Sequence, residues 1–157
     1  MASLVSRRAL LTSGVIALGV GGFWAAGGQN LFYDVITEAS AAEALDPVVA
    51  HRLAAEGKIT LVDIRRPDEW AKTGSGEHAV RLDLRRPDFI AELDKLVAGN
   101  RSAPLALICA RGVRSARENN KLIAAGFTNV IDVPEGMLGN AKGPGWIKRG
   151  LPLNTAP

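Results

Sequence analysis

Short apolar runs alternate with amphipathic segments from residue 47 onward, and this alternation predicts helices placed between buried strands. The apolar runs lack a polar residue at every second position, which is typical of strands covered on both faces of a parallel sheet. Such strands are predicted at 59–64, 105–108 and 129–133, with a shorter one at 80–84. We therefore expect an α/β fold, an open parallel sheet flanked by helices.

Proline or a capping residue begins most of the predicted helices, and glycine ends all of them but the short one at 67–70. Asp46 followed by Pro47 shows the pattern, because the aspartate caps the free N–H groups and proline has none to lose. These signals predict helices at 47–56, 67–70, 87–99 and 115–125. The glycine-containing stretches 72–77 and 136–150 are predicted as loops, the second with one helical turn near Trp146.

The N-terminal part of the chain has a different pattern. Arg7 and Arg8 precede a stretch from Ala9 to Tyr33 that carries no charge. Its apolar centre, residues 9–26, would span roughly 27 Å as a helix, which is marginal for a bilayer core. A basic segment followed by an apolar one is typical of export signals, and 39–41 (Ala-Ser-Ala) fits the small-residue rule for cleavage.

The string Ser-Arg-Arg-Ala-Leu-Leu at 6–11 resembles the twin-arginine signal of bacterial export. An ordinary secretory signal that carries two arginines is the alternative. The resemblance implies that residues 1–41 are an export signal or membrane anchor and that residues 42–157 form the folded domain. It also implies a location in the periplasm, either free or anchored in the inner membrane through residues 9–26. Cleavage and retention both stay open.

The composition argues against three kinds of function or site: nucleic-acid binding, a disulfide and a metal site. The chain of 157 residues has a net charge of only +3, so we expect no nucleic-acid partner. Its single cysteine excludes an intramolecular disulfide. Two histidines, His51 and His78, leave little material for a metal site, and none is predicted.

Cys109 is the candidate nucleophile, because it lies at the carboxyl end of the strand predicted at 105–108. Ligands bind at this edge of an open parallel sheet. Gly112 permits a backbone turn in which successive N–H groups face an anion, and the following helix and Arg111 and Arg114 add positive charge. These features favour a thiolate and an anionic substrate beside it. The alternative is a small core cysteine followed by a solvated helix face.

Residues 109–115, Cys-Ala-Arg-Gly-Val-Arg-Ser, resemble the active loop C-x-x-G-x-R-S/T of single-domain rhodaneses. Other segments that match the family's motifs are 61–65, 69–70, 129–137, 145–146 and 150–152. The resemblance extends from about residue 36 to 153. It implies a rhodanese-like sheet with the active-site loop between a strand end and a helix N-terminus.

The resemblance implies a sulfurtransferase that needs no cofactor. Cys109 would take a sulfane sulfur from a small anionic donor such as thiosulfate as a persulfide, and pass it to a thiol, cyanide or protein acceptor. The implied substrate-binding residues are Arg111, Gly112, Val113, Arg114 and Ser115. Asp63 and Arg65 are implied to support the loop, or else to form a plain ion pair at a strand end. Arg114 is alternatively a brace for the loop.

Two other functions compete with this one. A persulfide carrier would deliver sulfur to a specific partner with little turnover on thiosulfate. A phosphatase or arsenate reductase would need one more residue between cysteine and arginine than the four that separate Cys109 from Arg114.

Two segments depart from the rhodanese pattern. The family's G-H-I-x-G-A segment is replaced by Gly-Glu-His-Ala-Val at 76–80, which predicts a loop of different shape. Glu135 stands where glycine is common, and it is expected to bring a carboxylate near the rim of the site.

Overall fold

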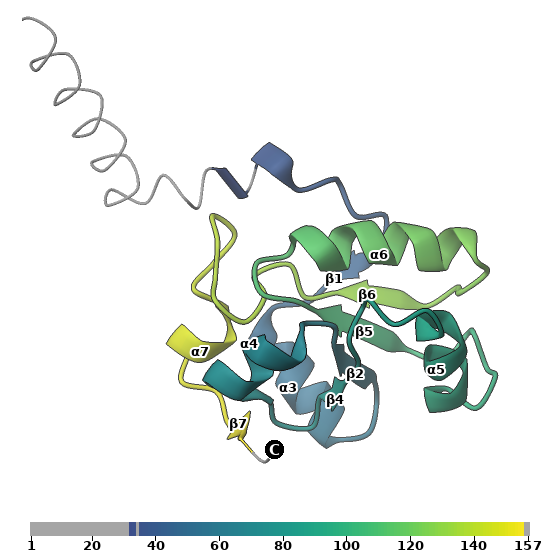
Figure 1. Cartoon of the computed structure of the whole chain (residues 1–157), viewed down its shortest axis with the longest axis horizontal. Coiled ribbons are helices and arrows are strands. Elements are labelled where there is room, and N and C mark those ends of the chain that lie inside the picture. Colours follow the sequence, from purple (N-terminus) through teal and green to yellow (C-terminus); the bar gives the residue numbers. More distant parts are fainter. Residues whose placement is uncertain (1–31, 34, 156–157) are drawn as a thin grey trace, which may run out of the picture.

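A five-stranded sheet forms the centre of the computed structural model, which describes residues 32–33 and 35–155 (Figure 1). The strand order is β1-β6-β5-β2-β4, and every neighbouring pair is parallel. The strands are β1 (Glu43–Ala44), β2 (Thr60–Asp63), β4 (Val80–Arg81), β5 (Leu105–Ile108) and β6 (Val130–Asp132). The predicted α/β class with an open parallel sheet is confirmed.

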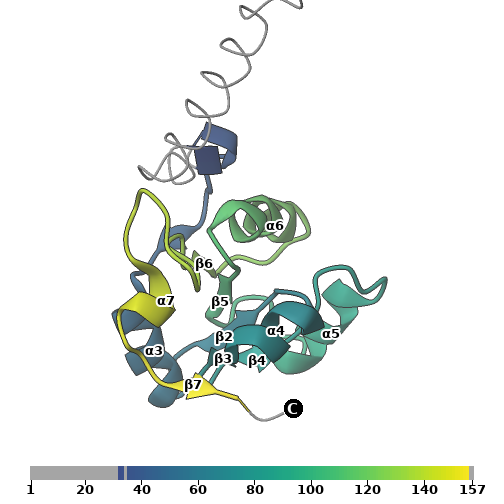
Figure 2. The ribbon, with the colours of Figure 1, turned by 60° about the vertical axis from the view of Figure 1, so that its left-hand side comes forward.

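Helices cover both faces of this sheet. The helices are α3 (Pro47–Ala55), α4 (Pro67–Thr73), α5 (Phe89–Leu96), α6 (Val113–Ala124) and α7 (Gly145–Lys148). Figure 1 shows α6 above the sheet and α3 below it, and Figure 2 shows the same layers from the side. A second, two-stranded sheet pairs β3 (Ser75–Gly76) with β7 (Leu153–Asn154) in antiparallel fashion.

The central strand β5 divides the core into two layers. Leu105 and Leu107 pack with residues of α5 and α6, whereas Ala106 and Ile108 pack with residues of α3 and α7. This is the period-two alternation of a strand that is buried on both faces. Cys109 continues the alternation and lies in the cluster on the α5–α6 side.

Most predicted elements are present, with differences at their ends. The prediction for 105–108 is confirmed as it stands, and α3 ends one residue early. The predicted loop at 72–77 contains the end of α4 and all of β3, which pairs with a strand far along the chain. Helix α5 begins at Phe89, later than predicted, because residues 84–88 form turns and not helix.

The N-terminal prediction falls largely on residues 1–31, which lie outside the described part of the chain. Among the helices that are described, none combines the length and apolarity needed to cross a membrane. Residues 38–41 pack along α6: Arg117 pairs with Glu38 at 3.1 Å, and Asn120 bonds the backbone at Ala39 and Ala41.

Two strand ends carry the same aspartate–arginine pair in different surroundings. Arg65 donates from Nε to Oδ1 of Asp63 at 3.0 Å and from Nη2 to Oδ2 at 2.7 Å. Arg85 repeats this geometry on Asp83 at 3.0 and 2.6 Å. The Arg65 side chain is 1% exposed and that of Arg85 is 63% exposed. Arg65 also donates to the Gly74 carbonyl at 2.6 Å, so it fixes the end of α4.

The pair of arginines offers a matched test of burial. We expect Arg65→Met to lower the free energy of unfolding by about 3–5 kcal/mol, because the Asp63 carboxylate then stays buried without a counter-charge. The control Arg85→Met removes the same hydrogen bonds in water and is expected to cost less than about 1 kcal/mol. Urea denaturation followed by tryptophan fluorescence measures both. Equal losses of unfolding free energy in the two variants would contradict the claim that burial makes the Asp63–Arg65 pair the more important one.

Candidate active site

The sulfur of Cys109 is enclosed by the loop that joins β5 to α6. The Gly112 N–H donates to Sγ at 3.2 Å, and Sγ lies 3.7 Å from the Ser115 hydroxyl. That hydroxyl in turn donates to the Gly112 carbonyl at 3.1 Å. Gly112 has φ 83°, a left-handed conformation, and caps α6. The chain therefore curls around the sulfur within four residues.

The N-terminal end of α6 faces the same loop. Helix α6 begins at Val113, two residues earlier than predicted, and the N–H groups of its first turn have no acceptor within the helix. Gly112 has no side chain to cap them. These donors and the positive end of the helix dipole favour an anion next to the sulfur.

A second loop, residues 134–140, supports the first from behind. The Met137 N–H donates to the Cys109 carbonyl and the Leu138 N–H to the Ala110 carbonyl, each at 2.9 Å. Asn140 donates from Nδ2 to the carbonyl of residue 111 at 2.9 Å and to that of residue 134 at 2.7 Å. The cysteine loop is thus bonded to its neighbour through its own backbone.

Glycine is required where the two backbones meet. A β-carbon at Gly112 would overlap the Pro134 carbonyl oxygen, and one at Gly136 would lie 2.6 Å from the Ala110 carbonyl oxygen. Both glycines also have positive φ angles, of 83° and 67°. Any larger residue at either position would have to move the loop that carries the sulfur.

A cavity of about 220 Å³ opens beside Cys109. Its lining includes Tyr33, Glu69, Arg111 and Arg114. Arg111 donates to the Gly139 carbonyl at 2.8 Å, and its guanidinium lies 4.9 Å from the centre of the Tyr33 ring. Cys109 itself is only 1% exposed, so the cavity is suited to small molecules.

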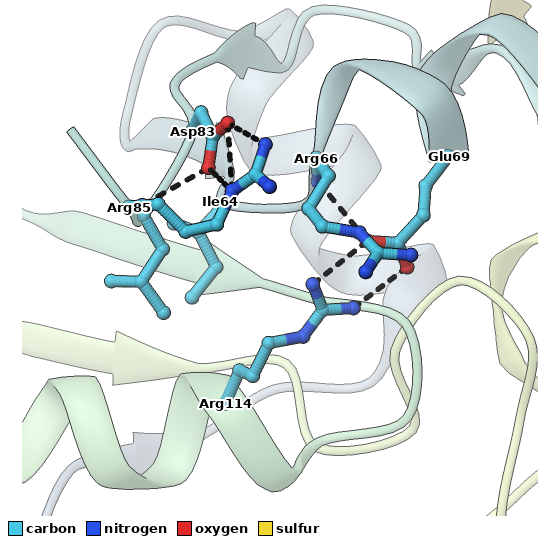
Figure 3. A pocket seen from close by; sticks show the side chains of 7 residues that line it. Ile64, Arg66, Glu69, Asp83, Arg85 and Arg114 are labelled. Carbon is cyan, nitrogen blue, oxygen red and sulfur yellow. Dashed lines mark hydrogen bonds and ion pairs between the residues drawn. The ribbon is translucent and has the colours of Figure 1, made fainter.

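Arg114 is braced by Glu69 of α4. Its two terminal nitrogens donate to the two carboxylate oxygens at 2.7 and 2.8 Å (Figure 3). Burial alone would raise the pKa of Glu69, but the hydrogen bonds from Arg114 and from the Arg66 backbone outweigh it and lower the pKa to about 2. Arg114 is thus both paired with Glu69 and part of the cavity lining, so both predicted roles, brace and substrate-binding residue, stay open.

The same ion pair lines a second cavity, of about 330 Å³. Figure 3 shows Arg114 reaching from α6 toward Glu69, with Arg66 on the far side of that carboxylate and the Asp83–Arg85 pair opposite. Since Glu69 and Arg114 belong to both linings, a change at either residue alters both cavities.

Asp132 is a buried carboxyl group near the loop. It is 2% exposed, and within the described part of the chain its Oδ1 atom has no hydrogen-bond partner. Burial raises the pKa of Asp132 to about 6, and the Ser115 hydroxyl and the Lys142 charge offset only part of that rise. Sequence reasoning did not single out Asp132, because it reads as one more position of an apolar strand.

The predicted loop residues are brought together as expected, but the supporting residues are not. Residues 111–115 surround Cys109. Asp63 and Arg65 fix the end of α4 and reach the loop only indirectly, since α4 carries Glu69. The expectation of a rim carboxylate at Glu135 is wrong. That side chain is buried, where it accepts from the Gly145 N–H at 2.9 Å and pairs with Arg149 at 2.6 Å.

Two polar residues of the cavity lining, Glu69 and Tyr33, lie outside the predicted site. Glu69 belongs to the matched segment 69–70, but its contact with Arg114 joins positions 45 apart in the chain, which no local pattern reveals. Tyr33 lies before the folded domain that was predicted to begin at residue 42, and no local pattern marks it.

A comparison with models of protein families shows to which family this chain belongs. The model of the rhodanese-like domain matches residues 46–141, which include the whole cysteine loop and most of the sheet. The chain belongs to the rhodanese-like domain family.

Three proteins show what this rhodanese-like domain is similar to. A tRNA uridine(34) hydroxylase of Chlamydia abortus is 29% identical over 107 residues, which are 64% of this chain and 32% of the relative. The chain thus spans about a third of that curated protein. Among solved structures, Rv0390 of M. tuberculosis is 26% identical with a TM-score of 0.59, over 74% of this chain and 100% of that one. The polysulfide-sulfur transferase homodimer of Wolinella succinogenes is 22% identical with a TM-score of 0.53, over 87% and 92%, and shows the same fold.

The buried Asp132 predicts a pH-dependent difference in stability. A carboxyl group whose pKa is raised from 3.8 to about 6 favours the folded state when protonated, so its contribution is lost as the pH rises through about 6. Relative to Asp132→Asn, the wild type should lose about 3 kcal/mol between pH 3 and pH 7. Urea denaturation at a series of pH values measures the difference, and the effect of Glu69 is common to both proteins. A difference that does not vary with pH would contradict the assignment.

Proposed function

We propose that this rhodanese-like domain is a sulfurtransferase whose nucleophile is Cys109. The observation that carries the proposal is the hydrogen bond from the Gly112 N–H to Sγ at 3.2 Å, inside a loop at the positive end of α6. A backbone N–H at the start of a helix that donates to a sulfur atom would also stabilise a negative charge on that sulfur during the reaction. The carboxyl end of a central parallel strand is the usual place for such chemistry.

The first half-reaction takes sulfur from the donor. The Cys109 thiolate attacks the outer sulfur of thiosulfate, a bond forms between the two sulfur atoms, and the sulfur–sulfur bond of thiosulfate breaks. Sulfite leaves with the electron pair of that bond. The terminal sulfur of the resulting persulfide then carries the negative charge, and the N–H groups of the first turn of α6 are available to bind it.

The second half-reaction returns the enzyme to its starting state. A nucleophilic acceptor, either cyanide or a thiolate, attacks the terminal sulfur, and the Cys109 thiolate leaves. Every atom and charge balances without a metal or an organic cofactor. The donor is expected to be anionic, because Arg111 and the first turn of α6 line the cavity, whereas the charge of Arg114 is paired with Glu69.

The small loop favours sulfur over phosphate as the transferred group. Four residues separate Cys109 from Arg114, the Gly112 N–H already contacts Sγ, and the Arg114 guanidinium is held by Glu69. A phosphoryl group needs several donors around three oxygens, and this loop leaves less room for them.

Intact-mass measurement of the full chain tests the proposal, and the full chain is needed because Tyr33 lines the cavity. After treatment of reduced protein with thiosulfate, we expect the wild type to gain one sulfur atom and Cys109→Ser to gain none. Cyanide should remove the added sulfur and release an equal amount of thiocyanate.

Repeating the measurement with a persulfide donor separates the alternatives. A gain from the persulfide but not from thiosulfate would favour a carrier that receives sulfur from a specific partner. No gain from either donor, in protein shown to be folded and reduced, would contradict the sulfurtransferase proposal. Hydrolysis of a phosphate ester that disappears in Cys109→Ser would point to the phosphatase.

A further inference from the structure

The chain's two histidines meet at one carboxylate, far along the sequence from each other. His51 lies on α3, and Glu77 and His78 form the turn that follows β3. The Oε2 atom of Glu77 lies 3.2 Å from Nε2 of His51 and 3.5 Å from Nε2 of His78. One possible ligand atom from each of the three residues lies within 4.8 Å of the other two, so two imidazoles and a carboxylate are close enough to bind one ion.

These separations fit the coordination of zinc. Zinc binds imidazole nitrogen and carboxylate oxygen at about 2.0–2.2 Å with tetrahedral geometry, so two of its ligands lie roughly 3.4 Å apart. The separations of 3.2 and 3.5 Å from the Glu77 oxygen bracket that value. Nitrogen donors of this kind disfavour magnesium and calcium, which take oxygen ligands. Glu77 and His78 are 46% and 45% exposed, which leaves access for the ion and for a water as fourth ligand.

The buried Trp146 contacts one of the three side chains and shares a hydrogen-bond acceptor with the backbone of a second. Its indole N–H and the Glu77 N–H both donate to the Pro152 carbonyl, at 2.9 and 3.0 Å. The indole also packs at right angles to the His51 ring, with the ring centres 5.5 Å apart. Helices α3 and α7 pack against each other beside the β3–β7 pair (Figure 2). The His51 ring and the backbone of Glu77 are therefore held in place by contacts other than the one between their two side chains.

His78 occupies a backbone conformation that glycine would adopt more easily. Its φ is 64°, in a turn closed by the Ala79 N–H and the Gly76 carbonyl at 3.0 Å. Residues with a β-carbon rarely adopt this region. Replacing His78 by glycine therefore removes a ligand and relieves the backbone at the same position, which makes the site testable without unfolding the protein.

We propose that His51, Glu77 and His78 form a zinc site that joins α3 to the turn after β3. The proposal replaces the expectation of no metal, which rested on the small number of histidines. It is independent of the sulfur chemistry at Cys109.

The test is a zinc titration of the untagged full chain in the Cys109→Ser background, since a thiolate would otherwise bind zinc itself. Competition with a chromophoric chelator should give one zinc per chain. His51→Gln, Glu77→Gln and His78→Gly should each weaken binding by at least about tenfold. The control Glu92→Gln, which removes a carboxylate on α5 paired with Lys95, should bind as the parent does.

A second readout identifies the ligands directly. Because the chain has only two histidines, both ring signals in the NMR spectrum should shift as one equivalent of zinc is added. His78→Gly should lose zinc while melting no lower than the parent in the absence of metal. Weak binding that the three substitutions leave unchanged, or histidine signals that do not respond, would overturn the proposal and leave two histidines hydrogen-bonded to a carboxylate.

Discussion

The close contact between two backbones is the constraint on which the site depends. The cysteine loop lies directly against residues 134–140, with hydrogen bonds from Met137 and Leu138 to the first two carbonyls of the loop. Gly112 and Gly136 lie where a β-carbon would overlap the backbone of the other loop. This contact fixes the path of the loop, and that path places the Gly112 N–H on the sulfur and leaves the first turn of α6 open beside it.

The Arg114 side chain at the cavity is positioned by a series of contacts, the first of which is the buried ion pair of Asp63 and Arg65. Asp63 and Arg65 hold the end of α4, α4 presents Glu69, and Glu69 holds Arg114 over the cavity. Because the Glu69 carboxylate neutralises the Arg114 guanidinium, Arg114 attracts an anion in the cavity less strongly than an unpaired arginine would. In the proposed reaction, the helix N-terminus and Arg111 would therefore contribute more than Arg114 to the binding of an anionic donor.

Local patterns predicted four of the five strands of the central sheet and the cysteine loop, because these are encoded within a few neighbouring residues, whereas the two-residue edge strand β1 was not predicted. The run at 105–108 followed by Cys109 and Gly112 needs no distant partner to be recognised. Glu69, Tyr33 and the His51–Glu77–His78 cluster escaped prediction because each acts across many positions. The prediction that Glu135 lies at the rim of the site failed for a related reason. Its place beside the loop was evident, but Arg149 and the Gly145 N–H, which hold the side chain elsewhere, were not.

The central claim is that the loop holds the terminal sulfur of a Cys109 persulfide with its backbone N–H groups. A crystal structure of the thiosulfate-treated protein measures this directly. The account predicts one extra sulfur bonded to Sγ, within hydrogen-bond distance of the N–H groups at the start of α6. An extra sulfur that points away from these groups, or a protein that gains sulfur without modification of Cys109, would contradict it.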